Sequence, residues 1–70
     1  MKYLVVIEET LTGYSAFSPD VPGCVAAAAT QNEIRRLMQE ALEFHLEGLR
    51  ADGEPVPPST TSSCYVEVAA

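Results

Sequence analysis

Apolar and polar positions divide the chain into three short stretches of strand character and one long helical stretch. Residues 2–9 (KYLVVIEE) are apolar on both faces for most of their length, which predicts an interior strand covered on two sides. The turn residues TLTG (10–13) then lead into GYSAFS (13–18), whose alternation predicts a second strand returning as a hairpin. SCYVEV (63–68) alternates in the same way and predicts a last strand.

The segment CVAAAA (24–29) is compatible with helix or strand by composition, because alanine favours the helix. The next residues decide between them. Thr30 and Glu33 form a capping box, in which the Thr30 hydroxyl accepts from the Glu33 amide and the Glu33 carboxylate accepts from the Thr30 amide. A helix is therefore predicted from about residue 31 to residue 50, and residues 24–29 are predicted to be a third strand.

The predicted helix carries more apolar surface than one sheet face needs. Its apolar side chains cover an arc of roughly 200° at about 100° per residue, with charged residues on the remaining side. The apolar surface of the helix that the sheet does not cover must pack against something else, and a second subunit is the simplest candidate. A dimer or tetramer is therefore expected. The helix residues predicted to form this oligomer contact are Phe44, His45, Leu46 and Leu49.

The segment SPDVPGC (18–24) connects the second and third strands with unusual rigidity. Pro19 and Pro22 fix φ and lack an amide donor, and Gly23 permits a sharp entry into the following strand. One interpretation is a stiff corner without further role. The other is that the prolines hold Asp20 exposed to solvent, where it contacts a partner together with Pro19, Pro22 and Gly23. A rigid loop suits such a contact because it loses little entropy on binding.

The net charge and the length of the chain limit the kinds of partner and function that are expected. The 70 residues carry a net charge of −6, which disfavours direct binding to nucleic acid and favours a basic partner. A single domain is expected, and a unit this small commonly needs a stabilising device such as self-association. No stretch has the roughly 18 consecutive apolar residues of a membrane helix, and no secretion signal is recognised, so a cytoplasmic location is expected.

The two cysteines, Cys24 and Cys64, have neither the number nor the spacing of a disulfide framework or a zinc site. Both are expected to be reduced and to behave as small apolar side chains. No cofactor or metal is expected.

Catalytic chemistry has little support in the sequence. Glu8, Glu9 and Glu67 could approach one another, but the helix offers no inward-facing acid to complete a two-metal carboxylate cluster. The single histidine, His45, lies within the apolar arc, where a packed side chain with one hydrogen-bonded nitrogen is expected; a pH-dependent contact is the alternative. We therefore expect a binding protein with no catalytic residues.

Several strings together resemble the HicB-like antitoxin domain. They are VVIEE, GYSAFSPDVPGC, the helix-opening T-x-x-E, and EALEFHLEGLRADGEPVPP over residues 40–58. The resemblance spans nearly the whole chain and implies an α+β, partial ribonuclease-H-like fold in the order β-β-β-α-β. It implies a three-stranded antiparallel meander, one helix packed on it, and a last strand beside the first and parallel to it. In that order, Cys24 and Cys64 lie on strands at opposite edges and cannot bond within one subunit.

The resemblance also implies a function. Domains of this family bind a small basic HicA-like ribonuclease toxin that cleaves messenger RNA, and neutralise it by covering its active surface. The negative charge suits that role, because electrostatic complementarity speeds encounter. The alternative is a stand-alone structural or regulatory oligomer without a toxin partner, which senses a small ligand through the proline loop.

Two departures from the family pattern limit what the resemblance implies. Many members have a glycine shortly before the helix-capping Thr, where this chain has Ala28 and Ala29. Typical full-length antitoxins carry a DNA-binding domain after this unit, whereas residues 1–70 are expected to form a single domain without one. Operator binding is therefore not carried over.

Overall fold

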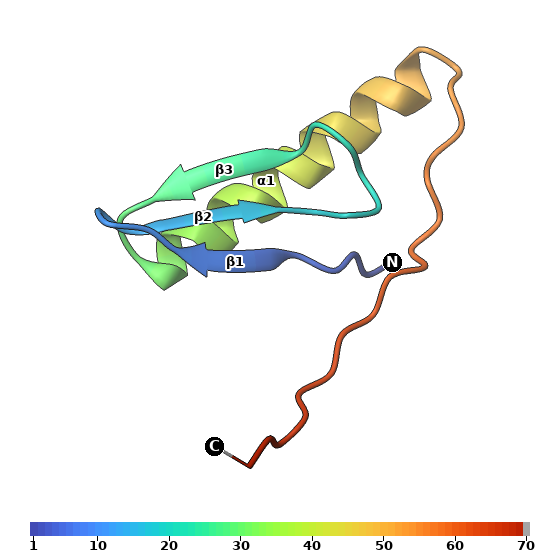
Figure 1. Ribbon diagram of the computed structural model, residues 1–70. Helices are drawn as coiled ribbons and strands as arrows, with labels where there is room; N and C mark the ends of the chain where they lie inside the picture. The colour runs from blue at the N-terminus through green and yellow to red at the C-terminus, as the bar shows by residue number, and fades with distance from the viewer. Residues whose placement is uncertain (70) are drawn as a thin grey trace.

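The protein folds as a three-stranded antiparallel sheet with one long helix packed on one of its faces. The computed structural model describes residues 1–69, with β1 at Val6–Glu9, β2 at Tyr14–Phe17, β3 at Val25–Ala28 and α1 at Gln31–Ala51. The strand order is β1-β2-β3, so the sheet is a simple meander. Figure 1 shows the helix crossing behind the sheet and extending beyond it, and a final segment that leaves the body of the molecule.

The strand register separates two faces of the sheet. Ile7, Ala16 and Ala26 are directly paired across the three strands and belong to the face that packs on α1. The next row, formed by Val6, Phe17 and Val25, must therefore lie on the opposite face, because successive side chains in a strand alternate. In this chain that outer face has no second layer of secondary structure over it within residues 1–69.

The core lies between the sheet and the helix. Ile34 and Met38 of α1 and Val21 of the proline loop are the largest fully buried side chains, each stabilising the fold by roughly 1.5–3 kcal/mol relative to exposure. The remaining buried members of this cluster are Ala16 and Cys24. Cys24 is a free and buried thiol, in agreement with the expectation of a reduced, small apolar side chain.

Both ends of α1 follow from local sequence. Thr30 is the N-cap, and its hydroxyl accepts a hydrogen bond from the Glu33 amide at 3.1 Å. At the other end Gly53 adopts φ +70°, and its amide donates to the Arg50 carbonyl while the Glu54 amide donates to the Leu49 carbonyl. These two bonds are the pair that defines a Schellman motif. The predicted helix is confirmed to within one residue.

The predicted capping box is only half formed. The hydrogen bonds of the described chain include the one from the Glu33 amide but none from the Thr30 amide to the Glu33 carboxylate. Glu33 is exposed, so its carboxylate is satisfied by water and gains little by folding back.

The predicted fourth strand is not formed. Residues 63–69 are exposed and pair with no strand of the described chain, so the three-strand-plus-helix part of the predicted fold is confirmed and the last strand is not. Alternating side chains predict an extended conformation, but they do not specify the edge that receives its hydrogen bonds. Cys64, on this segment, is a free cysteine and is exposed.

The absence of that strand also changes the place of β1. The prediction of an interior strand over residues 2–9 is wrong, because the ladder covers only Val6–Glu9 and β1 lies at an edge of the sheet. Its apolar residues on both faces are only half-buried. Apolar residues on both faces are typical of a strand whose two faces are both covered.

Candidate protein-binding surfaces

The proline loop is a closed and internally bonded unit. The Ser18 amide donates to the Cys24 carbonyl at 3.3 Å, and the Cys24 amide donates to the Val21 carbonyl at 3.2 Å. The Ser18 hydroxyl donates to the Leu4 carbonyl at 2.8 Å, which ties the loop to the segment before β1. Gly23 has φ +86°, a conformation that few other residues adopt without strain. The predicted rigidity therefore has a structural basis.

Val21 anchors this loop to the core. Its role was not predicted from the sequence. Its side chain is completely buried, although Pro22 and Gly23 beside it are exposed. No local pattern singles out Val21, since Val56 also lies between two prolines and is only half-buried. The loop thus presents its prolines to solvent while one side chain fixes it from below.

Asp20 forms the second unpredicted feature, a tether between the loop and the C-terminal segment. Its carboxylate accepts hydrogen bonds from the amides of Thr60 and Thr61, at 3.0 and 2.9 Å. It also accepts from their hydroxyl groups, at 3.2 Å for Thr60 and 2.6 Å for Thr61. The hydroxyl of Thr61 and then its amide contribute most to holding the pKa of the Asp20 carboxyl below its ordinary value of 3.8.

This tether gives Asp20 a role within the chain. A contact between Asp20 and a partner stays a prediction, and any such contact would have to share a carboxylate that already has four donors. Pro19, Pro22 and Gly23 remain open to a partner, because they are exposed at the surface of the loop.

An apolar groove of about 560 Å³ runs between the free edge of β1 and the helix. Tyr3, Val5 and Ile7 line one wall, and Met38, Leu42 and Leu46 line the other. Met1, Arg35, Gln39 and Glu43 complete its rim. The groove lies where a strand added beside the edge of β1 would place its inward side chains.

The uncovered face of the sheet forms a second surface. Phe17 is 39% exposed and Val25 is 66% exposed, and both flank the base of the proline loop. Val6 continues the same row onto β1. Large apolar side chains gathered in water commonly mark a contact site for another protein.

The four helix residues predicted to form an oligomer contact do not share one environment. Phe44 is exposed, His45 and Leu49 are half-buried, and Leu46 is buried within the chain. Phe44 lies on the flank of α1 opposite the groove, because residues 44 and 46 are about 200° apart on a helix. A contact on that flank would depend mainly on Phe44.

Titratable side chains do not gather into a reactive centre. Within residues 1–69 no three metal-ligating side chains lie together, and no helix of that part is long and apolar enough to cross a membrane. Burial raises the pKa of the Cys24 thiol above its ordinary value, which disfavours the reactive thiolate. By contrast, every acidic residue except Asp20 is exposed, so the surface is strongly negative.

These features define a small acidic α+β unit with apolar surfaces suited to protein contacts. The chain belongs to the family described as HicB-like antitoxin of bacterial toxin-antitoxin systems, whose profile matches residues 3–68.

Similar proteins include a 14.9 kDa protein from the rep-hol intergenic region of Haemophilus phage HP1, 39% identical over 66 residues. That match covers 94% of this chain but only 50% of the phage protein, so the chain spans about half of that relative. A UPF0150 protein of Synechocystis is 39% identical over 56 residues, covering 79% of this chain and 71% of the relative.

A solved structure described as the HicA3 and HicB3 toxin-antitoxin complex contains a similar chain. It is 33% identical, with a TM-score of 0.72, and the match covers 84% of this chain and 70% of that one. The likeness agrees with the three strands and the helix described above.

Proposed function

We propose that this protein is an antitoxin that binds a small basic ribonuclease toxin and neutralises it by covering its active surface. It acts as a binding protein, and in the cytoplasm, where a toxin that cleaves messenger RNA meets its substrate. The observation that carries the proposal is the match of residues 3–68 to the antitoxin family. The likeness to a chain of a toxin-antitoxin complex supports it.

The outer face of the sheet suits the toxin contact. Val6, Phe17 and Val25 supply an apolar row, and the exposed prolines 19 and 22 continue it at one end. Such a contact can combine apolar burial at its centre with charge attraction at its rim. Glu8, which is exposed on the same face as Val6, contributes negative charge beside the row.

Charge supports the proposal independently of shape. A net charge of −6 on 70 residues attracts a basic ribonuclease, whose own surface is positive because it binds RNA. Attraction of this kind speeds encounter and rejects acidic partners. It does so without any catalytic group in this chain.

Reconstitution tests the proposal. A HicA-like ribonuclease toxin is purified, and its cleavage of a defined messenger RNA is measured with increasing amounts of the antitoxin. We expect cleavage to stop near equimolar subunits. Full cleavage in the presence of excess folded antitoxin would contradict the proposal.

Variants locate the contact in the same assay. Val25→Asp on the outer face should weaken inhibition at least tenfold, because it places a charge in an apolar contact. Glu40→Gln, on the exposed side of α1, is the matched control and should inhibit like the unmodified protein. Circular dichroism establishes that both variants are folded.

Self-association through the helix flank is a further part of the proposed function. Phe44 is 78% exposed and would bury its ring against a second copy, with His45 and Leu49 at the margin of the contact. Such a contact gives a dimer or, combined with a second interface, a tetramer.

A further inference from the structure

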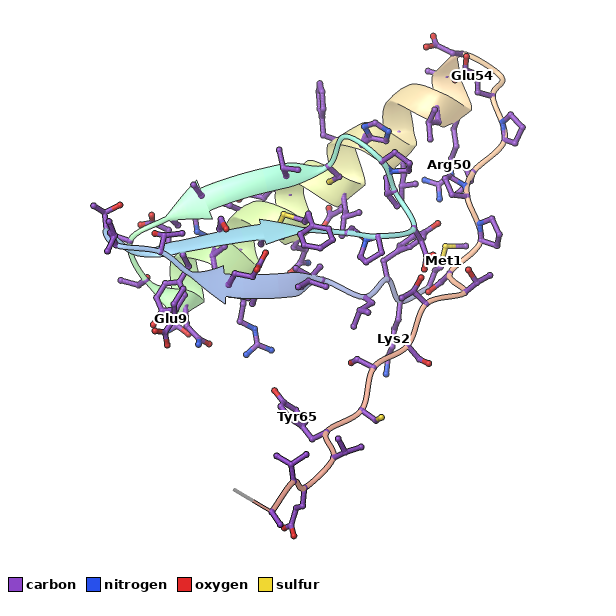
Figure 2. The ribbon with its side chains drawn as sticks, viewed as in Figure 1. Met1, Lys2, Glu9, Arg50, Glu54 and Tyr65 are labelled. Carbon is purple, nitrogen blue, oxygen red and sulfur yellow. The ribbon has the colours of Figure 1, made fainter. Side chains whose placement is uncertain are left out.

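The last described segment of the chain is extended and carries apolar side chains that have no cover. Val66 is 76% exposed, Val68 is 78% exposed and Tyr65 is fully exposed. In Figure 1 this tail, residues 62–69, diverges from β1 and ends away from the sheet. Figure 2 shows Tyr65 on this tail, clear of the strands. Three exposed apolar residues in so short a segment indicate a contact with another surface.

The same molecule holds a surface of matching chemistry that is open. The edge of β1 has free backbone donors and acceptors, and the groove beside it is lined by Met38, Leu42 and Leu46. An added strand would place alternate side chains into this groove and would pair its backbone with β1. Cys64, Val66 and Val68 have the required spacing of two.

The start of the tail is tied by hydrogen bonds to the proline loop of its own chain. Thr60 and Thr61 are fixed to Asp20 through both of their amides, and Tyr3 donates to the Pro57 carbonyl just before them. Residues 63–65 and residues 4–7 line a shared hollow of about 290 Å³, and no strand pairing forms between them. The tether fixes where the tail begins, and beyond it residues 63–69 pair with no strand of their own chain.

We propose that residues 63–69 of one copy add to the edge of β1 in a second copy, and that the two copies exchange these tails. Val66 and Val68 of each tail fill the groove of the other copy. Because every copy supplies one tail and one groove, the exchange closes a symmetric dimer without leaving either surface free. It also covers both the exposed edge of β1 and the groove, which in one chain alone are liable to aggregate. This inference does not depend on a toxin.

Cross-linking tests the exchange with the thiols of the chain itself. Gln39→Cys places a thiol on the exposed rim of the groove, and the exposed Cys64 lies on the tail. Cys24 is buried and does not compete. An equal mixture of nitrogen-15-labelled and unlabelled Gln39→Cys protein is unfolded, refolded and mildly oxidised, and peptides joined through residues 39 and 64 are analysed by mass spectrometry.

Under exchange, about half of those peptides should combine one labelled and one unlabelled half. A control with Glu47→Cys, on the exposed side of α1 outside the groove, should give at least tenfold less cross-linking to Cys64. Joined peptides without mixed isotopes would mean that the tail closes on its own chain and would overturn the proposal. Absence of the 39–64 link would also overturn it.

Sedimentation supplies an independent readout. The double variant Val66→Asp, Val68→Asp should raise the dimer dissociation constant at least tenfold, whereas Glu67→Ala, which faces away from the groove in an added strand, should leave it within twofold. A dimer unaffected by the double variant would overturn the proposal.

Discussion

Gly13 lies where the turn between β1 and β2 meets the end of β3. A Cβ built at this position would collide with the carbonyl oxygen of Ala28 and would lie 2.9 Å from the Cα of Ala29. These neighbours are backbone atoms, which cannot rotate away as a side chain does. The space at Gly13 is thus a requirement of strand pairing.

Gly13→Ala should therefore destabilise the protein by about 1–3 kcal/mol, the usual cost of forcing atoms into a packed site. Gly48→Ala is the matched control. A Cβ at Gly48 meets nothing within 4 Å, and alanine in a helix interior is favoured over glycine by roughly 0.5–1 kcal/mol, so this variant should be slightly more stable. Urea unfolding measures both, and equal effects of the two variants would contradict the packing argument.

Asp20 is the residue whose charge state matters most for the tether. The pKa of Asp20 is lower in the folded protein than in the unfolded chain, where it is near 3.8. The ionised carboxylate therefore stabilises the fold at pH values above 3.8. The contribution should disappear as the pH falls from there through the lower, folded pKa. The difference in unfolding free energy between the unmodified protein and Asp20→Ala should shrink over that range.

The same residue can be followed directly by carboxyl NMR titration. Thr61→Val removes the hydroxyl that contributes most to lowering the pKa of Asp20, so the midpoint should rise toward 3.8. Ser59→Ala serves as the control because Ser59 does not bond to Asp20. An unchanged midpoint in Thr61→Val would show that the hydroxyl is not the main cause.

Among the elements, α1 follows most closely from its own sequence. Thr30 begins it and Asp52-Gly53 ends it, because caps act within one turn of the residues that form them. The tail was mispredicted for the opposite reason. Its alternation is local, but strand pairing needs an edge elsewhere in the chain, and the bond from the Thr60 amide to Asp20, 40 residues earlier, is likewise not visible in any local pattern. Val21 likewise became core only through contacts that no local pattern specifies.

The N-cap offers a test at this scale. Thr30→Ala should cost about 1 kcal/mol of unfolding free energy, because the Glu33 amide loses its acceptor. Thr30→Ser keeps a hydroxyl and should remain within about 0.5 kcal/mol of the unmodified protein. Thermal unfolding followed by circular dichroism distinguishes them, and an equal loss in both variants would place the effect elsewhere than in the cap.

At the scale of the whole molecule, each of three separate surfaces has its own proposed contact. We propose the groove and the edge of β1 for the exchanged tail, the outer sheet face for the toxin, and the flank at Phe44 for a further copy. These assignments are compatible because the outer face and the groove lie on opposite sides of the sheet. A dimer formed by exchange would thus present two outer faces and could bind two toxin molecules.

Stability should then depend on protein concentration. A domain of this size buries only about 60% of its unfolded surface, and the proposed tail exchange adds burial available only to the dimer. Mass action therefore predicts that the thermal midpoint rises steadily over an approximately 100-fold increase in concentration. Calorimetry of Val66→Asp, Val68→Asp should give a lower midpoint that responds much less to concentration. If the unmodified chain has one midpoint throughout, the tail does not contribute to stability through a second copy.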